Sequence, residues 1–203
     1  AFFLNAGLVF DANEVQEHIE EHAVPHSAAL LARVRETQSP YFTGALARVN
    51  ASWQNLGQNA KVAAAKAGLR PPEANPFMNN VAQAVEIVDA LDRCADLCRK
   101  LAEPGAIASS SLPVPFEVKA GRAVGFTEAP RGALFHDLTL DAEGRVTHAS
   151  ILTPTAQNVA NLEVDMRLLA EKLVADGAAE DVVRLEIEKL VRAYDPCLSC
   201  SVH

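Results

Sequence analysis

The stretch from about Asn79 to Leu101 limits the possible folds of this chain more than any other part of the sequence, because it predicts one long amphipathic helix. Its apolar residues recur at three- and four-residue steps, the spacing that places side chains on one helix face. Since a helix gains most of its stability by burying such a face, we expect this one to pack in a core. The predicted core-facing residues are Val81, Ala84, Val88, Leu91, Cys94, Cys98 and Leu101.

The composition is that of a single folded domain. Of the 203 residues, 49% are hydrophobic and 22% are charged, which provides enough apolar material for a core and excludes a disordered chain. A net charge of −8 argues against sequence-independent binding of nucleic acid, which needs clustered Lys and Arg. No apolar run is long enough to predict a membrane span, and the apolar opening segment lacks the basic flank of a signal peptide. With only four cysteines, the chain is expected to be cytoplasmic.

The remaining pattern predicts a mainly α-helical chain with a small antiparallel β element, an α+β fold. Asp11 and Glu14 resemble a capping box and open a predicted helix that Pro25 ends. After about residue 110 the pattern indicates strands, and Asp141–Gly144 is typical of a turn between two of them. The predicted helices cover residues 11–24, 28–36, an alanine-rich segment ending near Gly68, 79–101, 157–175 and 179–194, and the predicted strands cover 112–119, 134–140 and 145–152.

The four cysteines form two pairs in different surroundings. Cys94 and Cys98 could in principle hold a metal ion, but free cysteine is among the most buried residue types, so we expect both to pack in the core. Cys197 and Cys200 have the two-residue spacing of zinc, iron–sulfur and redox-dithiol sites. The sequence lacks the thioredoxin-like pattern in which a redox dithiol is expected. A structural zinc site needs four ligands, and the tail offers only three: Cys197, Cys200 and His203. Because chain termini usually fray, we expect this tail to be ordered by burial.

Three motifs resemble segments of nickel–iron hydrogenase large subunits, and they occur in the same order along the chain as in that family. The tail Asp195-Pro-Cys-x-x-Cys-x-x-His203 resembles the family's carboxyl-terminal motif, after which a maturation protease cuts. Glu128-Ala-Pro-Arg-Gly132 and Thr153-Pro-Thr-Ala-Gln-Asn158 resemble two further signatures, and Tyr41–Asn50 and Asn75–Asn80 also look like large-subunit segments. The resemblance runs from about residue 20 to the end, and it implies the helical core of such a subunit with the amino-terminal half absent.

The resemblance also implies roles for single residues. Cys197 would be a terminal thiolate ligand of nickel, and Cys200 would bridge nickel to an iron that carries cyanide and carbon monoxide. Arg131 would hold its guanidinium over the open face of this metal pair, and Asp195 would pair with Arg131. Arg131, Cys197 and Asp195 are thus the implied catalytic residues. Around them, His203 and the carbonyl of Ile151 would bind magnesium, and the Thr155 hydroxyl would donate a hydrogen bond to a cyanide. Pro130 and Glu128 would lie in the outer layer of the site. Glu128 would act there as a proton relay or form a structural salt bridge.

The family binds nickel with four cysteines, two of them in an amino-terminal Arg-x-Cys-Gly-x-Cys motif that these residues lack. The chain is therefore expected to be the carboxyl-terminal part of a catalytic subunit for reversible H2 oxidation, active only with the missing half. The Pro-Thr-Ala-Gln-Asn version of the third motif looks like the soluble branch of the family, and this resemblance implies coupling to NAD(P). The implied partners are that half, a small subunit that carries the iron–sulfur clusters, NAD(P)-reducing diaphorase subunits and the maturation protease. Residues 1–110 are expected to form part of a helical bundle, 111–155 the hairpin region with the Arg131 loop, and 156–203 the closing helices and metal-binding tail.

Two other classes of protein remain open. A zinc-stabilised protein-interaction domain would use Cys197, Cys200, His203 and one further ligand. A non-catalytic hydrogenase-like subunit would share the fold without the metal-binding cysteines, and the two cysteines of the tail argue against it. The metal found in the purified protein distinguishes all three classes.

Overall fold

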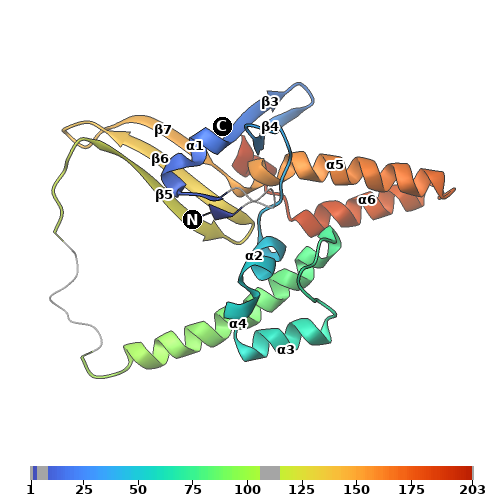
Figure 1. Ribbon diagram of the computed structural model, residues 1–203, viewed down its shortest axis with the longest axis horizontal. Helices are drawn as coiled ribbons and strands as arrows, with labels where there is room; N and C mark the ends of the chain where they lie inside the picture. Colours follow the sequence, from blue (N-terminus) through green and yellow to red (C-terminus); the bar gives the residue numbers. More distant parts are fainter. Residues whose placement is uncertain (1, 4–8, 106–114, 203) are drawn as a thin grey trace.

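The computed structural model describes residues 2–3, 9–105 and 115–202, and its helices and strands gather into two groups (Figure 1). One group is helical and the other combines the strands with the two closing helices. The α-helices are α1 (Val15–His18), α2 (Ala45–Ser52), α3 (Gln58–Lys66), α4 (Asn79–Leu101), α5 (Pro154–Ala175) and α6 (Glu180–Tyr194), and short 3-10 helices are η1 (Ala12–Glu14), η2 (Trp53–Asn55), η3 (Pro76–Met78) and η5 (Leu198–Ser201).

The described strands form three antiparallel sheets: a pair β1–β2, a hairpin β3–β4 and a three-stranded sheet in the order β5-β6-β7. In the last sheet Ala129 pairs with Gly132, so that only Pro130 and Arg131 lie in the turn between β5 and β6. This turn therefore fixes where Arg131 leaves the sheet. The bounds are β1 Phe2–Phe3, β2 Val9–Phe10, β3 Ile19–Val24, β4 Ser27–Val34, β5 Gly121–Ala129, β6 Gly132–Leu140 and β7 Val146–Leu152.

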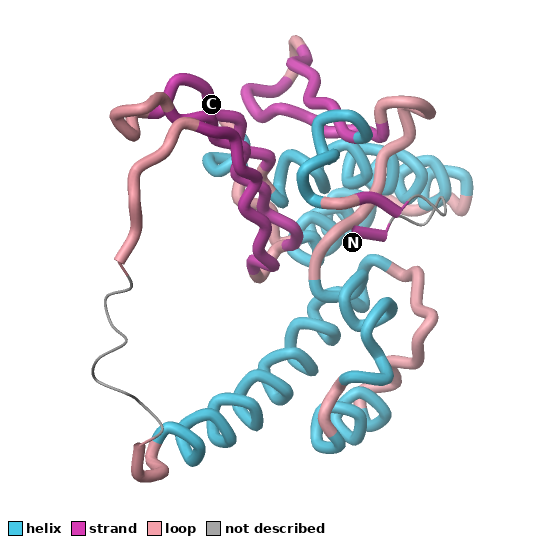
Figure 2. The backbone as a smooth tube through the Cα atoms, turned by 60° about the vertical axis from the view of Figure 1, so that its left-hand side comes forward, coloured by secondary structure: helices cyan, strands magenta, loops and turns pink. Residues whose placement is uncertain are grey.

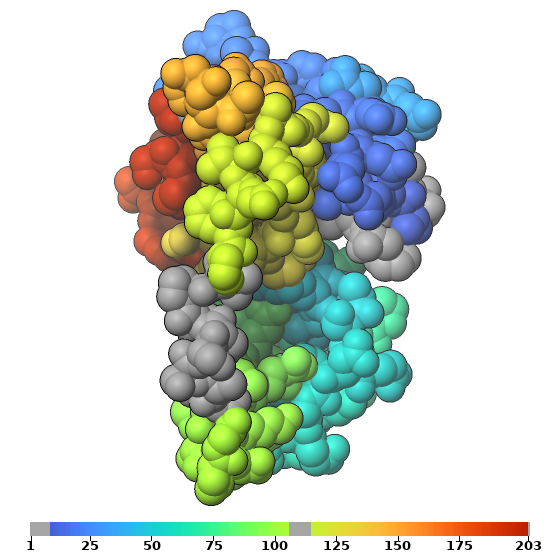
Figure 3. Space-filling model, turned by 90° about the vertical axis from the view of Figure 1, so that its left-hand side faces the viewer, coloured from blue at the N-terminus to red at the C-terminus, as the bar shows by residue number. Residues whose placement is uncertain are grey.

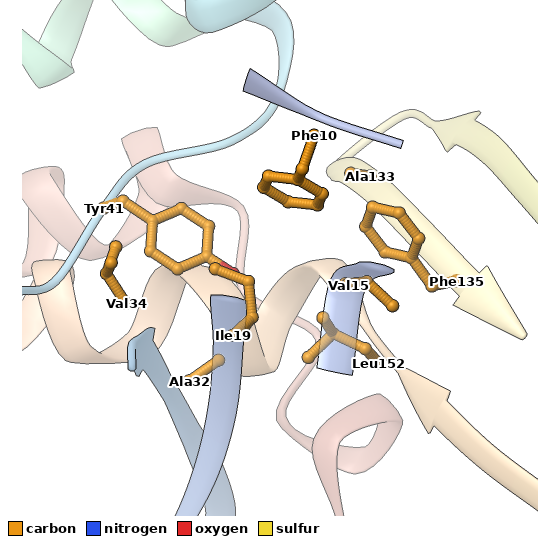
Figure 4. Close-up of a cluster of buried hydrophobic side chains, with 9 residues drawn as sticks. All are labelled: Phe10, Val15, Ile19, Ala32, Val34, Tyr41, Ala133, Phe135 and Leu152. Carbon is orange, nitrogen blue, oxygen red and sulfur yellow. The ribbon is translucent and has the colours of Figure 1, made fainter. Parts of the chain in front are cut away.

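One apolar cluster joins the hairpin to the three-stranded sheet (Figure 4). Phe135 of β6 and Leu152 of β7 meet Val15 of α1 and Ile19 of β3 in its centre, and all four side chains are buried. The cluster therefore fixes the start of β6, which follows the Arg131 turn, and the end of β7, which leads into α5. The other members are Phe10, Ala32, Val34, Tyr41 and Ala133.

The prediction of a mainly α-helical fold with small antiparallel sheets is confirmed, but the helices expected at 11–24 and 28–36 are wrong. Those residues form η1, the short α1 and the hairpin β3–β4, in which Val24 pairs with Ser27 across a two-residue turn. The physical reason is that β4 is buried on both faces. Leu31 packs against Val159 of α5, whereas Val34 lies in the cluster of Figure 4. A strand with two buried faces lacks the alternation by which a strand is recognised.

The predicted strand at 112–119 is also misplaced. Residues 112–114 lie outside the described part of the chain, residues 115–120 have no regular structure, and β5 begins at Gly121. Since β5 is an edge strand that is mostly exposed, its sequence carries no alternation that could mark it. The hairpin strands and the two closing helices are confirmed as β6, β7, α5 and α6, with α5 starting earlier, at Pro154.

Helix α4 has the predicted bounds, but only part of the predicted face packs on α2 and α3. Val81 and Val88 pack there, whereas Ala84 and Leu91 are exposed. Ala82 and Val85 are buried there beside Asp89, whose carboxylate accepts a hydrogen bond of 2.7 Å from the amide of Gly57, the residue that precedes α3. A carboxylate at the first turn of a helix binds orphan amides and favours the helix dipole, which explains a charged residue on a core face. Cys94 and Cys98 are both exposed, so the prediction that they pack in the core of this chain is wrong.

Candidate metal centre

Gly132 sets the path of the chain through the Arg131 turn. Its φ is +138°, and a Cβ atom built on it would lie 2.5 Å from Cγ2 and 2.8 Å from Oγ1 of Thr43. Glycine alone adopts such a conformation without strain and leaves the space that the neighbouring side chain occupies. The first strand residue after Arg131 is therefore pressed against the segment that leads into α2.

Two other segments of the chain, α5 and the residues that lead into α2, hold the backbone of this turn. The side chain of Asn158 in α5 donates to the carbonyl oxygen of Arg131 at 3.1 Å and accepts from the amide of Thr43 at 2.8 Å. The Thr43 hydroxyl in turn accepts from the amide of Ala133 at 3.1 Å. Both Asn158 and Thr43 are buried. Buried hydrogen bonds of this kind fix one geometry, because a lost partner would leave a desolvated polar group.

Arg48 of α2 also holds the turn, and sequence reasoning did not single it out. Its guanidinium binds both carboxylate oxygens of Glu86 at 2.7 Å, a carboxylate oxygen of Glu128 at 2.9 Å, and the carbonyl oxygens of Ala129 at 2.9 Å and Pro130 at 3.0 Å. Burial alone would lower the pKa of Arg48, but the two glutamates outweigh it and raise the pKa. The planar fork of an arginine suits such a junction of carboxylates and carbonyls.

These contacts show what Glu128 and Pro130 do in this chain. Glu128, predicted as a proton relay or a salt bridge, forms the salt bridge with Arg48, and Pro130 contributes its carbonyl oxygen to the same side chain. The signal available in the sequence was the Tyr41–Asn50 segment, which contains Arg48. Its partners Glu86 and Glu128 lie 38 and 80 residues away, so the sequence alone does not indicate them.

The side chain of Arg131 reaches the end of α6. Its Nε donates to the carbonyl oxygen of Asp195 at 2.6 Å, and a terminal nitrogen lies 3.1 Å from a carboxylate oxygen of the same residue. The other carboxylate oxygen accepts from the Gln83 side chain of α4 at 3.4 Å. Asp195 has φ +50° and ψ +51°, a left-handed conformation that Asp adopts more readily than most residues. It ends α6 and turns the chain toward the cysteines.

The tail packs on α5. The amide of Cys197 donates to the hydroxyl oxygen of Thr155 at 3.1 Å, and Thr155 is 2% exposed. Because this hydroxyl accepts from the tail, its own proton remains available for a second hydrogen bond. Thr155 is placed by the start of α5, where Thr153 caps the helix and Pro154 occupies its first turn. Ser201 is fully buried, so the tail is ordered up to this point by contact with the rest of the chain.

The two cysteines of the tail lie side by side, with their sulfur atoms joined in a disulfide and their Cα atoms 5.3 Å apart. Cys197 is partly buried and Cys200 is exposed. Once reduced, two sulfur atoms this close can face one metal ion. Thiolates are soft ligands, and both nickel and iron bind them well. The donor set therefore fits one half of a nickel–iron site.

The two predicted magnesium ligands are Ile151 and His203. Ile151 lies on β7, opposite His136 of β6, and is 38% exposed. His203 lies outside the described residues. Within the described ranges, no three or more His, Cys, Asp or Glu side chains form a group that could hold a metal ion, and none of the described helices is long and apolar enough to cross a membrane.

Comparisons with known proteins agree with these features. The family described as nickel-dependent hydrogenase matches residues 35–203. Sulfhydrogenase 1 subunit alpha of Pyrococcus furiosus is 39% identical over 204 residues, covering 97% of this chain and 44% of that protein. The NAD-reducing hydrogenase HoxS subunit beta of Cupriavidus necator is 35% identical over 127 residues, covering 61% of this chain and 25% of that protein.

A solved structure shows the same fold. The crystal structure of an NAD+-reducing [NiFe]-hydrogenase in the H2-reduced state superimposes with a TM-score of 0.74 at 23% identity, covering 96% of this chain and 43% of the other. The chain thus spans less than half the length of these relatives.

Proposed function

Because this chain belongs to the nickel-dependent hydrogenase family, we propose that it supplies the carboxyl-terminal half of the nickel–iron site in a hydrogenase catalytic subunit. The observation that carries the proposal is the position of the Cys197 and Cys200 sulfur atoms, which follow directly on the Asp195 that binds Arg131. In this role Cys197 and Cys200 would both be thiolates, because a thiol that coordinates a metal loses its proton. When bound, the metal pair supplies the heterolytic splitting of H2 and its reversal.

The residues of this chain have separate tasks in that reaction. In this proposal the Sγ atom of Cys197 would accept the proton released from H2, because a thiolate is a basic group. The Arg131 guanidinium would face the open side of the metal pair and stabilise charge that develops there. Asp195 keeps the guanidinium in that orientation through its two contacts.

Thr155 and the magnesium ligands complete the site in this proposal. The Thr155 hydroxyl, which already accepts from the Cys197 amide, would donate a hydrogen bond to a cyanide on iron. The His203 ring and the Ile151 carbonyl bind magnesium, a hard cation that takes few protein oxygens or nitrogens and keeps several waters. Carbon monoxide and cyanide on iron, and iron–sulfur clusters in partner subunits only, belong to the same proposal.

The whole enzyme requires further chains. We assign the missing thiolates to the remaining part of the large subunit, electron transfer to an iron–sulfur small subunit, and NAD(P) reduction to diaphorase subunits in the cytoplasm. A maturation protease would cut after His203. The support is the similarity to hydrogenases named as NAD-reducing, one by sequence and one by structure.

The test is metal analysis of the assembled complex, combined with H2-dependent reduction of a viologen dye and of NAD and NADP. Cys197→Ser and Cys200→Ser should each lower the nickel content at least tenfold and abolish dye reduction. Leu198→Ser, which introduces the same residue at an exposed position of the same tail, should retain both. A complex that contains zinc in place of nickel would favour the zinc-stabilised interaction domain and contradict the proposal.

A further inference from the structure

The second half of α4 carries an apolar stripe that no other described element covers. Ile87, Leu91 and Leu101 are 60%, 66% and 56% exposed, and the thiols of Cys94 and Cys98 lie between them and are exposed as well. In Figure 2 this part of α4 extends beyond α2 and α3. In Figure 3 the end of α4 is the yellow-green part at the bottom of the molecule. We name these five residues the α4 stripe.

The spacing of the α4 stripe is that of a helix–helix contact. Its members follow one another at steps of four, three, four and three residues, which is the alternation of the apolar positions in a heptad. The stripe therefore forms a straight seam about 21 Å long, at about 1.5 Å of rise per residue. A seam with this spacing accepts side chains of another helix between its own.

The residues beside the stripe indicate what kind of helical partner fits. In two-stranded coiled coils the flanking positions usually carry Glu and Lys, which choose the partner. Here they are Val88, Ala90, Ala95 and Leu97. Val88 is half-buried against the cluster of α2 and α3, whereas Leu97 is 57% exposed. A seam that is widened by apolar flanks suits burial in a bundle of several helices more than pairing with a second copy. The solvated face of the same half of the helix carries Asp96, Arg99 and Lys100.

We propose that the α4 stripe is the docking surface for helices of the part of the large subunit that lies outside these residues. The inference rests on the proposed function. Its support is the length of the relatives: two proteins that match 97% and 96% of this chain do so with only 44% and 43% of their own length. More than half of each relative therefore has no counterpart here, whereas α4 is already packed on its other face by α2 and α3.

The two cysteines of the stripe are built-in probes for this contact. The complex, purified with the rest of the large subunit, is treated with N-ethylmaleimide, and the labelled fraction of each cysteine is measured by peptide mass spectrometry. Cys94 and Cys98 should react at least tenfold more slowly than a control thiol introduced by Asp96→Cys, which lies on the solvated face of the same helix. Reaction at the control rate would overturn the proposal.

A charge in the stripe tests the same contact in a second way. Leu91→Asp should reduce recovery of the rest of the subunit with this chain at least tenfold, whereas Arg99→Asp, the same new residue at an exposed position on the other side, should leave recovery unchanged. Equal recovery in both variants would overturn the proposal. So would a bismaleimide cross-link from Cys94 of one copy to Cys94 of another, which would assign the stripe to self-association.

These results separate the docking surface from the proposed function. Nickel content and dye reduction report the function, whereas thiol labelling and subunit recovery report the contact. A complex that lacks nickel but protects both thiols would contradict the proposed function alone. A nickel-loaded, active complex with freely reacting Cys94 and Cys98 would contradict the docking surface alone.

Discussion

Gly132→Ala tests whether the Arg131 turn is pressed against Thr43 as the structure shows. The new Cβ would lie 2.5 Å from Cγ2 and 2.8 Å from Oγ1 of Thr43, at a residue whose φ is +138°. Holding alanine in such a backbone conformation costs about 1–3 kcal/mol. Overpacking a buried contact costs about 1–3 kcal/mol more. The free energy of unfolding should therefore fall by about 2–6 kcal/mol, a large part of the stability of an ordinary domain, which is about 5–15 kcal/mol.

Two further variants separate these contributions. Gly177→Ala places alanine at φ +76°, with no atom within 4 Å of the new Cβ, so it should lose only about 1–2 kcal/mol for the backbone conformation. Thr43→Ala removes the two closest atoms and leaves the Thr43 Cβ, 3.0 Å from the new Cβ. Alone it costs about 1–3 kcal/mol because the buried amide of Ala133 loses its acceptor. The double variant Thr43→Ala/Gly132→Ala should then be more stable than the sum of the single changes by about 1–3 kcal/mol.

Urea unfolding followed by circular dichroism measures all four free energies. The reasoning would be refuted if Gly132→Ala were no more destabilising than Gly177→Ala. Strict additivity of the Thr43 and Gly132 changes would also refute it, because independent effects would show that the two residues are not in contact.

Three other perturbations follow from contacts described above. Arg48→Gln should lower stability by about 1–3 kcal/mol, since it leaves partly buried carboxylates unpaired, and should speed amide hydrogen exchange at Arg131; unchanged exchange would count against its role. Arg122 lowers the pKa of Asp137, so their pair stabilises the fold above the ordinary Asp pKa and loses this effect as the pH falls through the lowered value. Arg122→Met should therefore move acid unfolding to higher pH, and an unmoved midpoint would contradict this. Burial, and to a smaller extent a nearby carboxylate, raises the pKa of both Tyr41 and Tyr194. Tyrosinate absorbance at alkaline pH should therefore appear only together with loss of circular dichroism. Its appearance in the folded chain would contradict the burial.

The parts of the site that could be predicted are those in which neighbouring residues carry the chemistry. The spacing of Cys197 and Cys200 can be read from the local sequence alone. The same is true of the order in which the motifs occur along the chain. The ion pair between Arg131 and Asp195, which the resemblance implied, is present in the structure. Residues that act through distant partners gave no such signal. Arg48 and Thr43 have their effect through contacts with residues more than 35 positions away.

The errors in the fold have a related cause. Periodicity shows which residues share a face, but it does not show how many faces are covered. The apolar residues on both faces of β4 predict a helix where the structure has a strand. The apolar residues on two sides of α4 predict an inner face that includes Leu91, which is exposed. In both elements the outcome depended on which other segments lie against them, and this is a property of the tertiary structure.

The left-handed backbone of Asp195 has a consequence for how its charge can be studied. Asparagine tolerates this conformation about as well as aspartate, whereas glutamate does not. Replacement by asparagine would thus remove the negative charge and keep the turn that leads to Cys197. Replacement by glutamate would keep the charge and strain the turn. Geometry and electrostatics, which are usually changed together by mutation at a metal centre, can be varied one at a time at this position.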